Sequence, residues 1–273
     1  MDHGLHFISG LPRAGSTLLS ALLTQNPALS AGMTSPLCGL FDAMLRQTSQ
    51  RIETSVFVDD AMRRRLLAGV FELAYADVHP TRTVFDTNRG WTARLPALAR
   101  LFPHAKVICC VRNPAWIVDS IECLIRRNAF ELSGIFGFEP GGTVYSRAEG
   151  LTGGTGMVGY AMNALRDALF GPDADRLLLV RYDSLTRNPL GTLAAIYQFC
   201  DLPPFAHDPE RVEPSPAMAE FDRRMGTPGL HHVAAAVRPN VRETILPPDV
   251  FARHEAAMFW RDLANLPSGV RIV

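Results

Sequence analysis

Residues 5–23, LHFISGLPRAGSTLLSALL, decide the fold. The apolar run 5–11 predicts a short buried strand, and residues 16–23 predict the start of a helix whose apolar residues recur on one side. Gly10, Pro12 and Gly15 lie between them and predict a turn. A glycine-containing turn that follows a strand and opens a helix is the sequence context of a phosphate-binding loop.

This turn carries the groups that bind an anion. Glycines let the backbone approach a phosphate, and the start of a helix offers unpaired N–H groups and the positive end of its dipole. Ser16 stands where the pattern GxxxxGK[ST] has its lysine, so the loop is poorly suited to cleaving ATP. A turn without a ligand is the structural alternative. We expect phosphate contacts from six residues: Pro12, Arg13, Ala14, Gly15, Ser16 and Thr17.

Strand and helix patterns alternate along the rest of the chain. The predicted strands are 83–86, 106–111 and 176–182, and the predicted helices include 95–101, 116–127 and 189–200. This alternation predicts an α/β fold with a P-loop-type parallel sheet flanked by helices, and one domain over residues 1–273. The glycine-rich stretch 134–159 predicts a mobile loop that serves as a lid or acceptor loop.

Composition narrows the possible partners. Lys and Arg total 27 and Asp and Glu total 27, so a formal charge of zero argues against a nucleic-acid-binding surface. We see no signal peptide and no run of about 18 apolar residues, which predicts a protein without a membrane span. The five cysteines lack paired metal-ligand spacing, which predicts reduced thiols in the cytoplasm and no metal site.

Two further patterns follow strands in the same chain. Arg112-Asn113-Pro114 follows the strand 106–111, and Ser120 lies in the next helix. The planar guanidinium of Arg112 can bind phosphate oxygens in pairs, although pairing with a carboxylate at a helix start is the alternative. Residues 179–185, LVRYDSL, end a strand at Tyr182 and precede a proline-led helix.

These motifs together resemble the sulfotransferases that use 3′-phosphoadenosine 5′-phosphosulfate (PAPS). The segment 11–19, LPRAGSTLL, is similar to their 5′-phosphosulfate loop, above all in the branch with the tyrosylprotein sulfotransferases. The resemblance runs from about residue 7 to 260 and implies transfer of a sulfuryl group from PAPS to a hydroxyl acceptor, a small molecule or a peptide, with 3′-phosphoadenosine 5′-phosphate (PAP) as product.

The resemblance also implies roles for single residues. It assigns the 3′-phosphate to Arg112 and Ser120 and adds Tyr182 as a cofactor contact. A late basic loop of the family contacts the cofactor as well. Its candidates here are His231, His232, Arg238 and Arg242, of which Arg238 is preferred on charge.

Catalysis needs cations and a base. Arg13 is expected near the bridging oxygen of PAPS. The family's second cation is a lysine whose position here is Thr87, so we expect Arg89 to supply that charge. The family's glutamate is absent from the stretch 31–36, which contains no acid. Asp86 is the preferred base because it ends a strand at the carboxyl edge, although capping or pairing with Arg89 is the alternative. The other candidates are Asp42, Asp59 and the histidines His231 and His232.

Two other functions fit parts of this pattern. A P-loop small-molecule kinase would use the same sheet and loop, but Ser16 replaces its lysine. A non-catalytic nucleotide-binding protein is suggested by the missing glutamate and lysine, whereas the presence of Arg13, Arg112 and Ser120 favours cofactor binding. Residues 33–44 are candidates for lining an acceptor pocket. The sequence identifies neither the acceptor nor the oligomeric state.

Overall fold

The structure is a computed structural model that describes residues 4–49, 53–78, 81–130, 142–213, 215–239, 241–261, 266–267 and 269–273. Its described strands form one six-stranded sheet in the order β2-β3-β1-β4-β5-β6, and every neighbouring pair is parallel. The strands are β1 (Leu5–Gly10), β2 (Leu29–Ala31), β3 (Thr83–Thr87), β4 (Val107–Val111), β5 (Leu177–Arg181) and β6 (Arg271–Ile272). The predicted parallel α/β sheet is confirmed.

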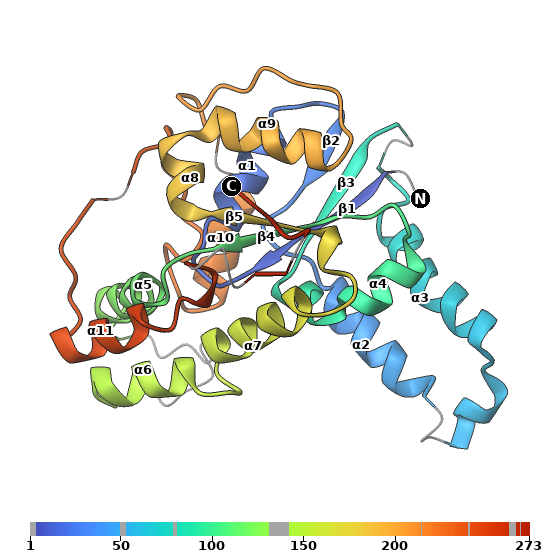
Figure 1. The fold of residues 1–273 in the computed structure, drawn as a ribbon, viewed down its shortest axis with the longest axis horizontal. Coiled ribbons are helices and arrows are strands. Elements are labelled where there is room, and N and C mark those ends of the chain that lie inside the picture. The colour runs from blue at the N-terminus through green and yellow to red at the C-terminus, as the bar shows by residue number, and fades with distance from the viewer. Residues whose placement is uncertain are drawn as a thin grey trace.

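Helices cover both faces of this sheet, with α8 and α9 on one side and α4 and α7 on the other (Figure 1). The helices near the N-terminal half are α1 (Ser16–Leu23), α2 (Leu37–Gln47), α3 (Asp60–Ala74), α4 (Leu95–Leu101) and α5 (Pro114–Arg127). The later ones are α6 (Val144–Thr152), α7 (Met157–Leu169), α8 (Tyr182–Arg187), α9 (Pro189–Phe199), α10 (Pro216–Arg224) and α11 (Pro248–Glu255). Short 3-10 helices include η1 (Glu53–Phe57) and η2 (Arg89–Arg94).

An aromatic cluster joins the sheet to the helices below β1 and β3. Phe7 of β1 lies 5.2 Å from Trp91 and 5.8 Å from Phe71 between ring centroids, and Phe71 lies 5.1 Å from Phe102. Phe41 of α2 completes the cluster. Aromatic rings of this size bury large apolar areas, so the cluster holds α2, α3 and η2 against the strands that carry the site.

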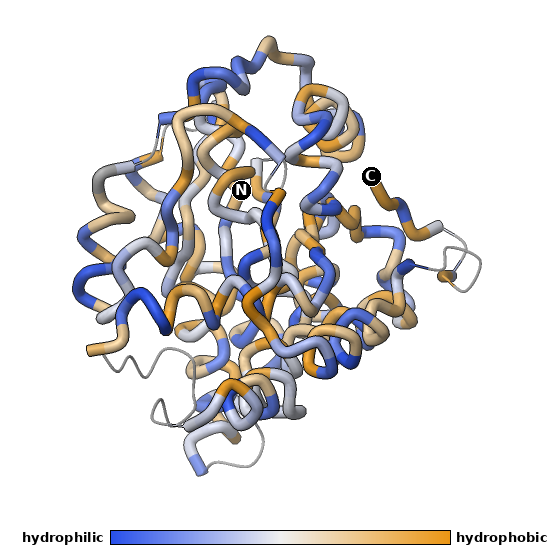
Figure 2. The backbone as a smooth tube through the Cα atoms, turned by 90° about the vertical axis from the view of Figure 1, so that its left-hand side faces the viewer, coloured by the Kyte–Doolittle hydropathy of each residue, from blue (hydrophilic) through white to orange (hydrophobic). Residues whose placement is uncertain are grey.

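The helices are short, and their composition is mixed. Within the described ranges, no helix is both long and apolar enough for a span. Figure 2 shows hydrophilic and hydrophobic stretches interleaved along the helices, which is typical of helices with one face on a core and one face outward.

The loop predicted over residues 134–159 needs correction. Residues 134–141 lie outside the described residues, and the remainder contains α6 and the start of α7. Glycines were misleading because they allow close packing between these helices: a Cβ at Gly156 would lie 2.1 Å from the carbonyl oxygen of Gly150, and one at Gly159 would lie 2.0 Å from that of Gly153. The lid role itself stays a prediction.

Candidate active site

Loop 10–17 connects β1 to α1 with the geometry of an anion-binding turn. Gly10, Arg13 and Gly15 adopt positive φ angles of 113°, 57° and 98°. The first turn of α1 receives no side-chain cap from Gly15, and Leu19 makes the first backbone bond to the Gly15 carbonyl. The amides at the start of α1 therefore remain available to an anion, as helix N-termini allow.

Loop 10–17 forms part of the wall of a cavity of about 640 Å³. Other walls come from the ends of β3 and β4, from α5, from the start of α8 and from residues 229–239. Six arginines line it: Arg13, Arg89, Arg112, Arg127, Arg238 and Arg242. Across the described part of this lining there is no aspartate or glutamate. The net charge of the chain is zero, but the cavity is strongly cationic and fits an anionic ligand.

Arg112 is the first residue after β4, and its side chain lines the cavity. Its guanidinium stacks over the Tyr182 ring at 4.2 Å from the centroid and donates to the carbonyl oxygen of Arg13 at 3.2 Å. The proposed alternative, an ion pair with a carboxylate, is absent for Arg112 within the described ranges. Burial lowers the pKa of Arg112. The guanidinium thus keeps donors free for a ligand, and Tyr182 holds its plane.

Arg13 lies at the same end of the cavity as Arg112. Its Nε donates to Ser120 Oγ at 3.1 Å, and its Nη1 donates to the carbonyl oxygen of Leu230. Burial, followed by the nearby charge of Arg112, lowers the pKa of Arg13 to about 10, so the side chain stays protonated at neutral pH. The sequence analysis assigned Arg13 to the bridging oxygen and assigned Arg112 and Ser120 to the 3′-phosphate. In the structure, Arg13 contacts both Ser120 and Arg112.

Thr87 and Arg89 line the cavity at the end of β3. Thr87 is 5% exposed and its hydroxyl lies 3.4 Å from that of Ser20, so it provides no charge where the family has lysine. The Arg89 side chain is exposed and, among the described residues, has no hydrogen-bond or ion-pair partner. This placement is compatible with Arg89 as the second cation.

Asp86 is placed differently from its prediction. Its side chain is fully buried and accepts three hydrogen bonds: from Ser35 Oγ at 2.8 Å, Tyr75 Oη at 2.6 Å and Trp91 Nε1 at 2.6 Å. Burial raises its pKa, against the effect of these donors. A carboxylate held by three donors outside the cavity lining favours a structural role for Asp86, and its role as general base stays a prediction.

The other acidic candidates also lie outside the cavity. Asp42 forms a two-bond ion pair with Arg94 at 2.5 and 2.9 Å. Asp59 caps α3 by accepting from the Met62 amide at 2.6 Å. These two carboxylates have structural partners, so neither is placed to act on a ligand in the cavity.

His231 and His232 are the candidate bases that do line the cavity. His231 Nδ1 lies 2.6 Å from Asp222 Oδ1, and the His231 amide donates to Asp222 Oδ2 at 2.7 Å. Asp222, on α10, is 2% exposed. Sequence reasoning missed Asp222, because it belongs to a proline-rich and charged stretch that shows no motif.

Arg238 and Arg242 both line the cavity, and each forms an ion pair with an acidic side chain outside the lining. Arg238 pairs with Glu210, and both side chains are exposed. Arg242 pairs with Asp119, which also accepts from Thr244 Oγ1 at 2.6 Å. The preference for Arg238 over Arg242 therefore stays a prediction.

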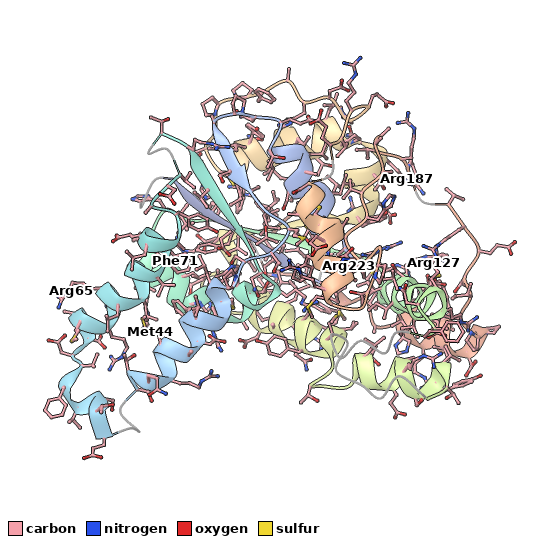
Figure 3. All side chains as sticks on the ribbon, turned by 180° about the vertical axis from the view of Figure 1, so that it is seen from behind. Met44, Arg65, Phe71, Arg127, Arg187 and Arg223 are labelled. Atoms are coloured by element: carbon pink, nitrogen blue, oxygen red, sulfur yellow. The ribbon has the colours of Figure 1, made fainter. Side chains whose placement is uncertain are left out.

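Arg127 is a cavity arginine that the sequence analysis missed. It lies in the last turn of α5, seven residues after Ser120 (Figure 3). Seven residues are about two helical turns, so both side chains fall on one face of α5. That spacing could have identified Arg127 from the sequence.

In the described residues, no group of three or more His, Cys, Asp or Glu side chains could hold a metal ion.

Parallel strands and a cationic cavity at a loop-to-helix turn are typical of α/β proteins that bind phosphate-like groups. A family model for the sulfotransferase family matches residues 6–207. The chain therefore belongs to the sulfotransferase family.

Individual relatives are distant. Protein-tyrosine sulfotransferase 1 of Danio rerio is 25% identical over 208 residues, covering 74% of this chain and 54% of its own length. The Homo sapiens protein of that name is 26% identical over 126 residues, or 44% of this chain and 34% of its own length. The matched part of the chain thus spans about half of the length of the first relative and about a third of the length of the second. A solved sulfotransferase domain from the curacin biosynthetic pathway aligns over 92% of this chain and 89% of its own, with 16% identity and a TM-score of 0.49.

Proposed function

We propose that this chain transfers a sulfuryl group from PAPS to a hydroxyl acceptor. The single observation that carries the proposal is the cavity itself. It joins the open amides of loop 10–17 to Arg112 and Ser120, with Arg13 of the loop in contact with both of these residues, and no carboxylate is present among its described lining residues. A ligand with anionic groups at two separate points matches these two donor sets, and PAPS has a 5′-phosphosulfate and a 3′-phosphate.

The proposed role of each residue follows from its position in the cavity. Amides and hydroxyls of loop 10–17 bind the 5′-phosphosulfate, as expected of a helix start. Arg112, Ser120 and Arg127 bind the 3′-phosphate, with Tyr182 holding the Arg112 plane. Arg13 and Arg89 stabilise the charge that develops on the transferred group and on the leaving phosphate, which preorganised cations do at low reorganisation cost. The proposal needs no metal ion.

The acceptor side is open to several hydroxyl classes. Met33 and Thr34 line the same cavity as Arg89 and belong to the predicted acceptor pocket at residues 33–44, and Met157 lines this cavity too. Because the relatives are named protein-tyrosine sulfotransferases, a phenolic hydroxyl is the first class to test.

The five cysteines are free thiols in the structure. Free thiols support the prediction of a reducing, cytoplasmic location.

Calorimetry separates this proposal from the kinase alternative before an acceptor is known. We expect PAP to bind without magnesium and ATP to bind weakly, because Ser16 replaces the lysine of ATP-cleaving loops while Arg112 and Ser120 offer a second phosphate site. Adenosine 5′-phosphosulfate, which has no 3′-phosphate, is the matched ligand control. Equal binding of PAP and ATP, or binding only with magnesium, would overturn the proposal.

A further inference from the structure

We propose that His231 is the catalytic base that removes the proton from the acceptor hydroxyl, and that Asp222 is the positioning residue for its ring. This inference rests on the proposed function and supplies the group that the family resemblance leaves missing. Asp86 is the less suitable candidate, because three donors enclose that carboxylate.

Two contacts join Asp222 to His231, one at the backbone amide and one at the ring. The carboxylate of Asp222 accepts from the His231 backbone amide through one oxygen and faces Nδ1 through the other, at 2.7 and 2.6 Å. The Phe221 ring packs edge-on against the imidazole at 5.4 Å between centroids. A carboxylate at Nδ1 keeps the proton on that nitrogen, so Nε2 carries the lone pair.

The other proton acceptors in the described lining are less suited. Cys123 contacts the buried Asp119 at 3.7 Å, and burial raises the pKa of its thiol. Tyr182 lies under the Arg112 guanidinium. The His232 side chain is exposed, and no described group holds its ring. His231 is the histidine that combines access to the cavity with a fixed orientation.

His231 also lies next to the cation assigned to the transferred group. Leu230, the preceding residue, accepts a hydrogen bond from Arg13 through its carbonyl oxygen. The groups that face His231 are thus Asp222 and Phe221 from α10 and, through Leu230, Arg13 from loop 10–17. Because Arg13 is the cation proposed for the transferred group, this contact supports a place for His231 near the reacting end of the donor.

The chemical step balances without a further reactant. The acceptor oxygen forms a bond to sulfur while the bond between sulfur and the bridging oxygen of PAPS breaks. Its electron pair leaves with the 5′-phosphate of PAP. The acceptor proton passes to Nε2 of His231, and the imidazolium that results is stabilised by Asp222 until the proton leaves to solvent.

The first experiment reads the proton position by nitrogen-15 NMR of labelled histidines in the PAP complex at neutral pH, with His231→Gln to assign the signal. We expect a proton on Nδ1 and none on Nε2. Asp222→Asn should move the proton to Nε2, because an amide nitrogen donates to Nδ1 instead of accepting from it. A wild-type proton on Nε2, protons on both nitrogens, or an unchanged signal in Asp222→Asn would overturn the proposal.

The second experiment follows PAP release from PAPS with water, 4-methylphenol or 4-nitrophenol as acceptor. His231→Gln and Asp222→Asn should lower the 4-methylphenol rate by about 10²–10⁴-fold, the range of general-base catalysis. The loss should be much smaller with 4-nitrophenol, which is already partly ionised near neutral pH. His104→Gln, an exposed histidine outside the cavity lining, should keep the wild-type rate.

Calorimetry with PAP and thermal unfolding complete the comparison. His231→Gln should keep the wild-type PAP affinity. Weaker PAP binding together with equal rate losses on both phenols would make His231 a phosphate ligand and overturn the proposal. If the wild-type protein released no PAP with any acceptor, the proposed function would fail, and the NMR signal of His231 would still decide whether Asp222 sets its protonation.

Discussion

Two neighbouring strands end at the same edge of the sheet, yet the residues at their ends have different surroundings. β1 and β3 are paired in register, with Ile8 beside Thr87. β1 leads into loop 10–17 and an open cationic cavity, whereas Asp86 on β3 lies in a closed network of three donors. Thr87, one residue later, does line the cavity. Because successive side chains of a strand point to opposite faces, a difference of one residue separates a site residue from a structural one.

Arg112→Ala tests the cavity side and should have the largest effect. Charge-assisted hydrogen bonds contribute roughly 1.5–3 kcal/mol each, and two of them imply a loss of PAP affinity of about 10²–10⁴-fold. Calorimetry should show a much smaller loss for adenosine 5′-phosphosulfate. Arg65→Ala, on α3 and far from Arg127 in Figure 3, is the control. Equal losses for both ligands would mean that Arg112 acts through the fold.

Asp86→Ala tests the closed network on β3 and should act on stability. Each buried donor left without its acceptor costs about 1–3 kcal/mol, so we expect the free energy of unfolding to fall by roughly 3 kcal/mol or more. PAP affinity should stay at the wild-type value. Urea unfolding and calorimetry measure the two effects, with the exposed Asp60→Ala as control. A stable Asp86→Ala protein with a lost turnover would restore Asp86 as the base.

Arg238→Ala should have the smallest effect, which refines the comparison within the cavity. Arg238 already pairs with Glu210, and both side chains are exposed, so solvent screens their charges. We expect PAP affinity to change by a few-fold at most, and less than in Arg242→Ala, whose guanidinium is more enclosed. Calorimetry of both variants checks this order. A larger loss in Arg238→Ala would support the choice made from the sequence.

The sequence predicts the features that depend on local pattern. Strand and helix alternation gives the parallel sheet, and the spacing of loop 10–17, Arg112, Ser120 and Tyr182 anticipates which residues meet at the cavity. Loop 10–17, Arg112 and Tyr182 lie where a strand is followed by a helix, and Ser120 lies within α5, the helix that follows Arg112, so their positions follow once the strands are aligned.

The features that it misses depend on contacts between distant segments. Asp86 is enclosed by Ser35, Tyr75 and Trp91, and no local pattern shows that these three donors converge. Asp222 reaches His231 only because the chain turns back after α10. The glycines near residue 156 serve close helix packing, which composition alone cannot distinguish from a loop.

Gly10 has a consequence for ligand choice. It pairs with Cys110 of β4 so closely that a Cβ would lie 2.2 Å from the Cys110 carbonyl oxygen, and its φ of 113° also excludes other side chains. Loop 10–17 and Arg112 therefore start from two backbones in direct contact, and the distance between them is fixed. If the site binds PAPS as proposed, this fixed spacing would favour a nucleotide by the length between its two anionic ends rather than by its total charge.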